Sequence, residues 1–204
     1  MLDALWIVLT YLLGSIPFGL VVARLFCGVD PRTAGSGNIG ATNVARLCGF
    51  PYGVLTLLLD VAKGFGPVLA ARLLHGSWVF VSLMVLAALA GHMFPIFLRG
   101  RGGKGVATSI GVFLAAAPVP AAVAVGCCVA VIAATGYVSA GSLVLAVAMP
   151  LLCLALGPAE LAPAAGLAAV VILWKHRENI ARLRAGQEKS WRKKPSARAT
   201  REGD

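Results

Sequence analysis

Charged residues are scarce in this sequence, and acidic residues are the scarcest of all. Of the 204 residues only 13% are charged and only 8 are Asp or Glu, whereas 59% are hydrophobic. The mean hydropathy is +0.86. A water-soluble globule of this length needs more polar surface than such a composition supplies. The composition therefore excludes a soluble protein and predicts an integral membrane protein.

Other features are missing as well. The sequence lacks the regular alternation of apolar and polar residues that a transmembrane β-barrel requires. Its five cysteines form no C-x-x-C pair and have no histidine ligand set nearby. We therefore expect them to be small core residues rather than disulfide partners or metal ligands, and we predict no metal site and no cofactor.

Seven apolar segments predict an all-α fold with about seven transmembrane helices, several of them short. In chain order the segments are 4–26, 52–74, 78–98, 106–117, 121–134, 143–156 and 161–174. The first three reach the roughly 20 residues that a spanning helix needs, and the others need their flanks to cross the bilayer. The first segment is long for a signal peptide and follows Asp3 rather than a basic start, so we expect it to be retained.

Basic residues are divided unequally between the two sides of this arrangement. One side receives all but two of the 18 basic residues, while Arg72 falls on the other side and Lys63 lies within the second span. The positive-inside rule then places the N-terminus outside and the C-terminus in the cytoplasm. Because no basic groove with interleaved aromatic residues is present, the net charge of +10 predicts no nucleic-acid partner.

The chain divides into two parts by composition. We expect residues 1–188 to form a single membrane-embedded domain, and residues 189–204 to form a basic, disordered cytoplasmic tail. Two interpretations of the tail are open. In one, which we favour, its basic residues only mark the cytoplasmic side; in the other, they contact anionic lipid headgroups.

The segment RGRGGKGVAT, residues 99–108, has the features of an anion-binding loop. Its last three glycines are Gly102, Gly103 and Gly105. Glycines in this pattern let backbone N–H groups point into a concavity, and Lys104 adds a positive charge just before a helix begins. The spacing does not satisfy a Walker A loop. A tight turn with a lysine that only marks the cytoplasmic side is the competing interpretation, and the neighbouring arginines favour phosphate.

Two further polar segments fall on the same side. GSGNIGATN, residues 35–43, carries more hydrogen-bonding side chains than a turn needs, although a flexible turn remains the alternative. These side chains are Ser36, Asn38, Thr42 and Asn43, with Arg46 one helical turn beyond. In KHRENIARL, residues 175–183, His176 and Asn179 share one helical face. An amphipathic interfacial helix is the competing interpretation there, and we prefer it for Arg177, Arg182 and Arg184.

Asp60, Lys63 and His92 are titratable residues well inside apolar segments. Asp60 and Lys63 are three residues apart, so they can neutralise each other in lipid as a structural pair. His92 is interpreted as a hydrogen-bonded core histidine.

Together with YLLGSIPFG (residues 11–19), LLLDVAKG (57–64) and GHMFPIF (91–97), these motifs resemble those of the bacterial acyl-phosphate glycerol-3-phosphate acyltransferases of the PlsY type. The likeness runs in order from about residue 11 to residue 188. It implies a seven-helix enzyme of the bacterial inner membrane whose active site faces the cytoplasm. Such an enzyme transfers a fatty acyl group from a long-chain acyl phosphate to the 1-hydroxyl of glycerol 3-phosphate, and it uses neither acyl-CoA nor acyl carrier protein directly.

The resemblance also implies roles for individual residues. Those that would bind and orient phosphate or acyl-phosphate oxygens are Ser36, Arg46, Lys104, Ser142, His176 and Asn179, and those that would shape the loop are Gly102, Gly103 and Gly105. The residues expected in catalysis are His176, Asn179 and Ser36, and Glu188 is expected to brace the terminal segment.

Two questions stay open at this level. His176 could act as a general base, or the phosphate of the acyl phosphate could take the proton, and we favour the second route. An organic-phosphate transporter could also array glycine loops and basic residues. It should show repeated halves with sites near mid-membrane, and no internal repeat is found. A purely structural membrane protein would not need three polar loops on one side.

Overall fold

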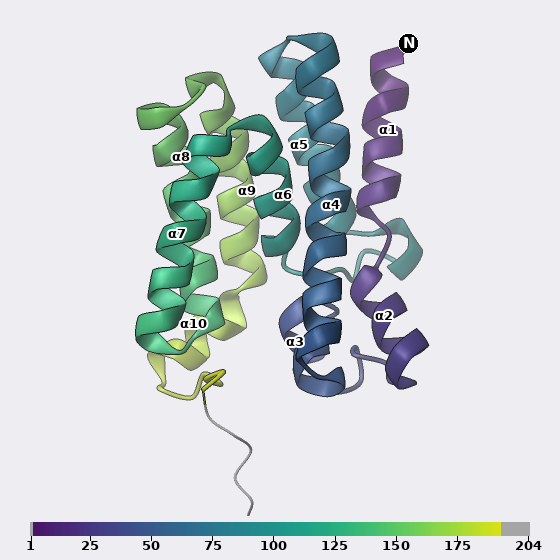
Figure 1. Cartoon of the computed structure of the whole chain (residues 1–204), viewed down its shortest axis with the longest axis vertical. Helices are drawn as coiled ribbons and strands as arrows, with labels where there is room; N and C mark the ends of the chain where they lie inside the picture. The colour runs from purple at the N-terminus through teal and green to yellow at the C-terminus, as the bar shows by residue number, and fades with distance from the viewer. Residues whose placement is uncertain (1, 193–204) are drawn as a thin grey trace, which may run out of the picture.

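The computed structural model describes residues 2–192, and within that range all regular structure is helical (Figure 1). In chain order the α-helices are α1 (Leu2–Gly14), α2 (Phe18–Cys27), α3 (Ala41–Cys48), α4 (Phe50–His75), α5 (Trp78–Met93), α6 (Val106–Ala116), α7 (Pro118–Thr135), α8 (Val138–Leu156), α9 (Ala162–Lys175) and α10 (Arg177–Arg184), with short 3-10 turns η1 (Ile96–Leu98) and η2 (Ala159–Leu161). The predicted all-α class is confirmed, and every predicted apolar segment contains a helix.

The predicted count of seven spans is not confirmed. Five helical stretches in the described chain are long and apolar enough to cross a membrane: 2–27, 50–75, 78–98, 118–135 and 138–156. A sixth results if η2, α9 and α10, which bend by 61° at their junction, count as one span. Helix α6 has only 11 residues, about 16 Å at 1.5 Å per residue, which is half of a bilayer core. The membrane orientation stays a prediction.

Three interruptions of the helical chain lie beside one another. Pro17 separates α1 from α2, because proline restricts the residue before it and removes a backbone donor. Helix α5 ends just before Phe94 and Pro95, earlier than its apolar sequence predicts. Helix α6 begins after Gly105, which adopts a left-handed conformation with φ of 86°. In Figure 1 the connection from α5 to α6 crosses the bundle part-way along α4.

The backbone carbonyls freed at these interruptions receive hydrogen bonds from other parts of the chain. Each bond joins two segments that the interruptions bring together, which satisfies groups that would be costly to leave unpaired in a membrane. The pairs are Tyr11 Oη with the Phe94 carbonyl (2.9 Å), Lys63 Nζ with that of Ile16 (2.8 Å), Gly103 N–H with that of His92 (3.1 Å) and Lys175 Nζ with that of Met93 (2.7 Å).

Glycines set the depth at which α6 begins. A Cβ on Gly64 of α4 would press on the Thr108 carbonyl at 2.8 Å, and one on Gly111 of α6 would collide with the Val61 carbonyl. The two helices therefore approach closely near the middle of α4, with the first turns of α6 beside it. The glycine-rich loop that precedes α6 is consequently recessed within the bundle.

The cysteine prediction is wrong for one pair. Cys27 and Cys48 are joined in a disulfide, with 5.9 Å between their Cα atoms. The two residues end α2 and α3, which both pack against α4, so the fold brings together positions 21 apart in sequence. Cys128 and Cys153 are buried and free, as expected of small core residues. Cys127 is free but exposed, so the core prediction is wrong for it as well; its neighbour Cys128 takes the inward-facing position on α7.

The tail prediction needs one correction at its start. Trp191 N–H and Ser190 Oγ both donate to the Gly136 carbonyl, at 3.0 and 3.2 Å. These bonds hold residues 190 and 191 against the turn between α7 and α8. Residues 193–204, the rest of the predicted tail, lie outside the described residues.

Replacing Gly111 tests the close approach of α4 and α6. Gly111→Ala should lower the free energy of unfolding by roughly 1–3 kcal/mol, because the added methyl group collides with backbone that cannot move aside cheaply. Gly66→Ala on α4 is the matched control, since a Cβ there meets nothing within 4 Å. Thermal unfolding of the two variants in one detergent makes the measurement, and equal midpoints would contradict the close approach.

Candidate active site

The polar loop between α2 and α3 is organised by the side chain of Asn43, which is buried at the start of α3. Asn43 Oδ1 accepts the Ser36 N–H at 2.9 Å. Its Nδ2 donates to three backbone carbonyls of the loop, those of Pro31, Ala34 and Asn38, at 2.9–3.1 Å. Asn43 therefore serves the loop itself rather than a ligand. The Ser36 side chain is left on the exposed part of the loop.

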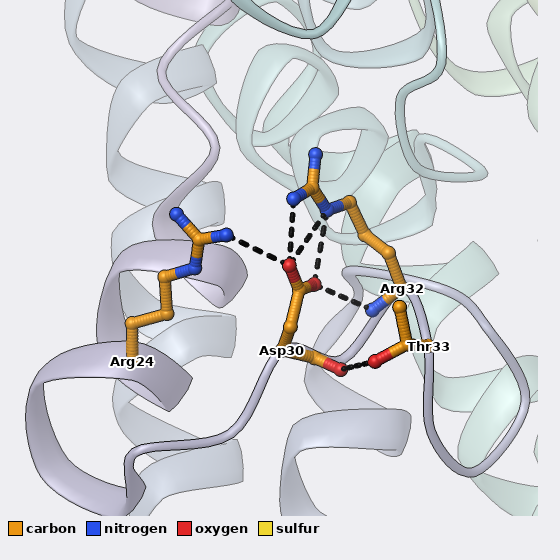
Figure 2. Close-up of polar contacts among 4 residues, drawn as sticks. All are labelled: Arg24, Asp30, Arg32 and Thr33. Atoms are coloured by element: carbon orange, nitrogen blue, oxygen red, sulfur yellow. Dashed lines mark hydrogen bonds and ion pairs between the residues drawn. The ribbon is translucent and has the colours of Figure 1, made fainter.

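Asp30 fixes the entry to the same loop (Figure 2). Its carboxylate accepts Nη2 of Arg24 at 2.8 Å, and it accepts Nη2 of Arg32 at 2.6 Å as well as the Arg32 backbone N–H at 3.0 Å. These contacts, those from Arg32 foremost, hold the pKa of Asp30 well below its usual range. The Asp30 carbonyl also accepts the Thr33 hydroxyl at 3.2 Å, which closes a turn.

The glycine-rich loop before α6 rests on the end of α5. Gly103 donates its N–H to the His92 carbonyl, and a Cβ on Gly103 would collide with the His92 ring. A Cβ on Gly102 would collide with the His92 carbonyl itself. The predicted shaping role of these glycines thus has a steric cause, which is contact with α5.

Lys104 and Asn179, predicted from motifs 75 residues apart, meet directly. Lys104 Nζ donates to Asn179 Oδ1, and Asn179 Nδ2 donates to Oε1 of Glu188. Glu188 also accepts the Ser139 hydroxyl at 2.8 Å and Nε of Arg182 at 2.7 Å. The loop, α10, the start of α8 and the segment after α10 are therefore joined through one amide and one carboxylate.

The charges of this network act on one another. Burial lowers the pKa of the Lys104 ammonium, and the nearby Arg182 and Arg46 lower it further, while Glu188 opposes the shift. Burial alone would raise the pKa of Glu188, but hydrogen bonds from Arg182, Asn179 and Ser139 hold it below its usual range. The lowered pKa favours the carboxylate form of Glu188 among the basic side chains around it, and its bracing role stays a prediction.

His176 lies at the junction of α9 and α10 and is buried. Its Nδ1 is 2.9 Å from the Ile172 carbonyl one turn back. Because a carbonyl can only accept, Nδ1 must carry a proton, and the neutral ring then has its lone pair on Nε2.

The other predicted residues are less closely linked. Ser142 is buried in the first turns of α8 and donates to the Val138 carbonyl at 2.9 Å. Arg46 is exposed on α3, and its contact with Asn43 is long, at 3.4 Å. Ser36 has no recorded bond to Lys104, His176 or Asn179 in the described chain. The structure therefore joins the glycine-rich loop (residues 99–108) to the segment 175–183. Among the described residues it shows no such bond from the loop at residues 35–43.

Two residues of the network were missed or misread from sequence. Ser139 lies one turn before Ser142 on the same helical face, and that spacing could have revealed it. Arg182 was assigned to an interfacial helix, whereas its guanidinium pairs with the partly buried Glu188. In the described residues no group of three His, Cys, Asp or Glu side chains is placed to hold a metal ion.

Comparisons with known proteins agree with this architecture. A family model described as glycerol-3-phosphate acyltransferase matches residues 4–186. Glycerol-3-phosphate acyltransferase of Solidesulfovibrio magneticus is 63% identical over 92% of this chain and 94% of its own. That of Geobacter sulfurreducens is 49% identical over 87% and 92%.

Two solved structures share the fold. Crystal structures of PlsY, an integral membrane glycerol 3-phosphate acyltransferase, superpose with TM-scores of 0.89 for the glycerol 3-phosphate form and 0.86 for the lysophosphatidic acid form. Their sequences are 40% and 38% identical to this one, over 94% and 93% of this chain and 96% and 95% of theirs.

Fold and site together define a multi-pass integral membrane protein with a recessed cluster of basic and amide side chains. The chain belongs to the glycerol-3-phosphate acyltransferase family.

Replacing Glu188 tests the network, because a second glutamate near the same arginine provides a matched control. Glu188→Gln should lower acyl transfer at least tenfold, since losing charged hydrogen bonds costs about 1.5–3 kcal/mol and frees Asn179 and Lys104 to move. Glu178→Gln is the control, because Glu178 is 74% exposed and lies 4.0 Å from the same Arg182. Initial rates of both variants decide the matter, and a fully active Glu188→Gln would refute the bracing role.

Proposed function

We propose that this protein transfers a fatty acyl group from acyl phosphate to the 1-hydroxyl of sn-glycerol 3-phosphate. The products are 1-acyl-sn-glycerol 3-phosphate and inorganic phosphate, which makes the reaction a step of phospholipid synthesis. The acceptor and the product are supported by the crystal structures of PlsY, which comprise a glycerol 3-phosphate form and a lysophosphatidic acid form.

The contact of Lys104 with Asn179 carries this proposal. It joins a glycine-rich loop at the start of α6 to the helix that follows His176, in the electrostatic neighbourhood of Arg46. A site that receives two phosphorylated reactants needs several donors and positive charges from different segments, and this arrangement supplies them. Ser36, Arg46, Lys104, Ser142, His176 and Asn179 are the proposed ligands of the phosphate and acyl-phosphate oxygens.

The chemical step is a direct acyl transfer. The 1-hydroxyl oxygen attacks the acyl carbonyl carbon, the bond from that carbon to the phosphate oxygen breaks, and the hydroxyl proton passes to the departing phosphate. Lys104 and Asn179 stabilise the negative charge that develops on oxygen. No cofactor is needed, because acyl phosphate already carries an activated acyl group.

His176 could act either as the general base or as a group that orients the glycerol hydroxyl. With Nδ1 donating to Ile172, a neutral His176 presents an acceptor at Nε2, which suits a proton acceptor as well as a hydrogen-bond partner of the glycerol hydroxyl. We propose the substrate-assisted route, in which His176 orients the hydroxyl and the phosphate takes the proton.

The proposed location is the bacterial inner membrane, with the active site facing the cytoplasm. Support comes from the distribution of basic residues in the sequence. Figure 1 agrees in placing α3 and α10 together at the end of the bundle opposite the start of α1.

Donor choice is the first test. The purified protein should form labelled lysophosphatidic acid from palmitoyl phosphate and labelled glycerol 3-phosphate, and none from palmitoyl-CoA. Lys104→Ala should reduce the rate at least a hundredfold, because it removes the charge at the centre of the site. Turnover with palmitoyl-CoA alone would overturn the donor assignment.

His176→Gln separates the two proton routes. Under the substrate-assisted route the variant keeps substantial turnover and shows a raised KM, since glutamine can still hydrogen-bond. His75→Gln is the control, because His75 contacts Asp3 at 2.9 Å at the far end of α4. A loss of kcat beyond about a thousandfold with unchanged KM would instead identify His176 as the general base.

A further inference from the structure

Three titratable side chains are buried together where the helical interruptions meet. Lys63 Nζ lies 2.8 Å from Asp60 Oδ1 on α4, and His92 Nδ1 on α5 lies 3.6 Å from the same oxygen. All three side chains are at most 4% exposed. None of them belongs to the proposed set of substrate ligands.

Their polar atoms are not fully satisfied. A separation of 3.6 Å is too long for a hydrogen bond, so within the described chain His92 Nδ1 has no hydrogen-bond partner, and Asp60 Oδ1 has only its ion pair with Lys63 Nζ at 2.8 Å. Burying such groups costs free energy that a hydrophobic replacement would not. A core that needed only to be filled would not retain them, which points to a function beyond packing.

The opposite side of His92 contacts the glycine-rich loop. The three atoms closest to a Cβ built on Gly103 all belong to the His92 ring, and the His92 carbonyl accepts the Gly103 N–H. Lys104 follows Gly103 directly. The position of the His92 ring therefore limits where the backbone at Gly103 and Lys104 can lie.

We propose that His92 is a positioning residue that holds the Lys104 loop, and that Asp60 anchors its ring while Lys63 balances the buried charge. Lys63 also donates to the Ile16 carbonyl, which ties the anchor to the break between α1 and α2. The inference rests on the proposed phosphate role of Lys104 and adds to it the means by which the loop is held.

A steric rescue tests this proposal. The backbone of Gly103 does not require glycine, since its φ is not in the left-handed region. Gly103→Ala should nevertheless raise KM for a phosphorylated substrate at least tenfold, because the new methyl group displaces the loop from the ring. His92→Ala removes the ring, so Gly103→Ala with His92→Ala should recover to the level of His92→Ala alone.

Gly102→Ala is the matched control for the rescue. Its Cβ would collide with the His92 carbonyl and with Pro95, neither of which His92→Ala removes. His92→Ala should therefore leave the Gly102→Ala defect in place. Rescue of both glycine variants, or of neither, overturns the proposal, as does full activity of Gly103→Ala alone.

A second measurement separates positioning from mere stability. His92→Ala should raise KM by about tenfold with a smaller change in kcat, and it should speed hydrogen exchange of the Gly103 amide. His75→Ala, which removes a histidine that pairs with Asp3 and stacks on Phe80, should change the unfolding midpoint without changing KM. An unchanged KM and unchanged exchange in His92→Ala overturn the proposal.

The anchor is tested by removing both charges at once. Asp60→Asn alone leaves Lys63 buried without a counter-charge and risks misfolding, so Asp60→Asn with Lys63→Met is the informative variant. It should fold and reproduce the KM and exchange defects of His92→Ala, and wild-type values would refute the anchoring role of Asp60. Lys104→Ala is assayed in parallel, because only an unaffected KM there would undermine the phosphate role itself.

Discussion

The buried pair of Asp60 and Lys63 is the constraint around which the rest of the molecule is arranged. Helix α4 runs past the point where α1 gives way to α2, where α5 stops and where α6 starts. Each interruption leaves backbone groups that lipid cannot satisfy. Lys63 supplies a donor to one of them, and Asp60 gives that lysine a counter-charge at a depth where an isolated ammonium would be costly. The pair thus ties α4 to the break between α1 and α2, at the same depth as the recessed loop.

A recessed loop suits the chemistry of this family. Its reaction brings together a water-soluble phosphate ester and a reactant with a long apolar tail, so the reacting atoms must meet close to the boundary between headgroups and hydrocarbon. Helix α6 is short because the chain before it is used for the loop rather than for spanning. The close packing of Gly64 and Gly111 then places the start of α6, with its free backbone donors, beside the middle of α4.

Hydropathy predicted the apolar helices well, because in a membrane the length of an apolar run nearly determines a helix. It failed where the chain stops being helical for a reason outside the run, as at Phe94, where α5 ends against the loop. The motifs identified Lys104 and Asn179, but a bond between residues 75 apart depends on helix packing that no local pattern records. The same holds for the Cys27–Cys48 bond, which follows from how α2 and α3 lie on α4. Asn43 was identified as a polar residue of interest, yet only the structure shows that four of its hydrogen bonds go to the backbone of its own loop.

The bond between Lys104 and Asn179 gives a largely buried ammonium an acceptor within a basic site. Burial makes an unpaired Lys104 ammonium unfavourable, and the neighbouring arginines make it more so. Asn179 Oδ1 offers the ammonium an acceptor of the same kind as a phosphate oxygen, and Glu188 holds that amide in the orientation that presents Oδ1. Under the proposed function, a phosphate oxygen would take the place of Asn179 Oδ1 as the acceptor for Lys104. Asn179 therefore links the two charged groups, because its Oδ1 accepts from Lys104 while its Nδ2 donates to Glu188.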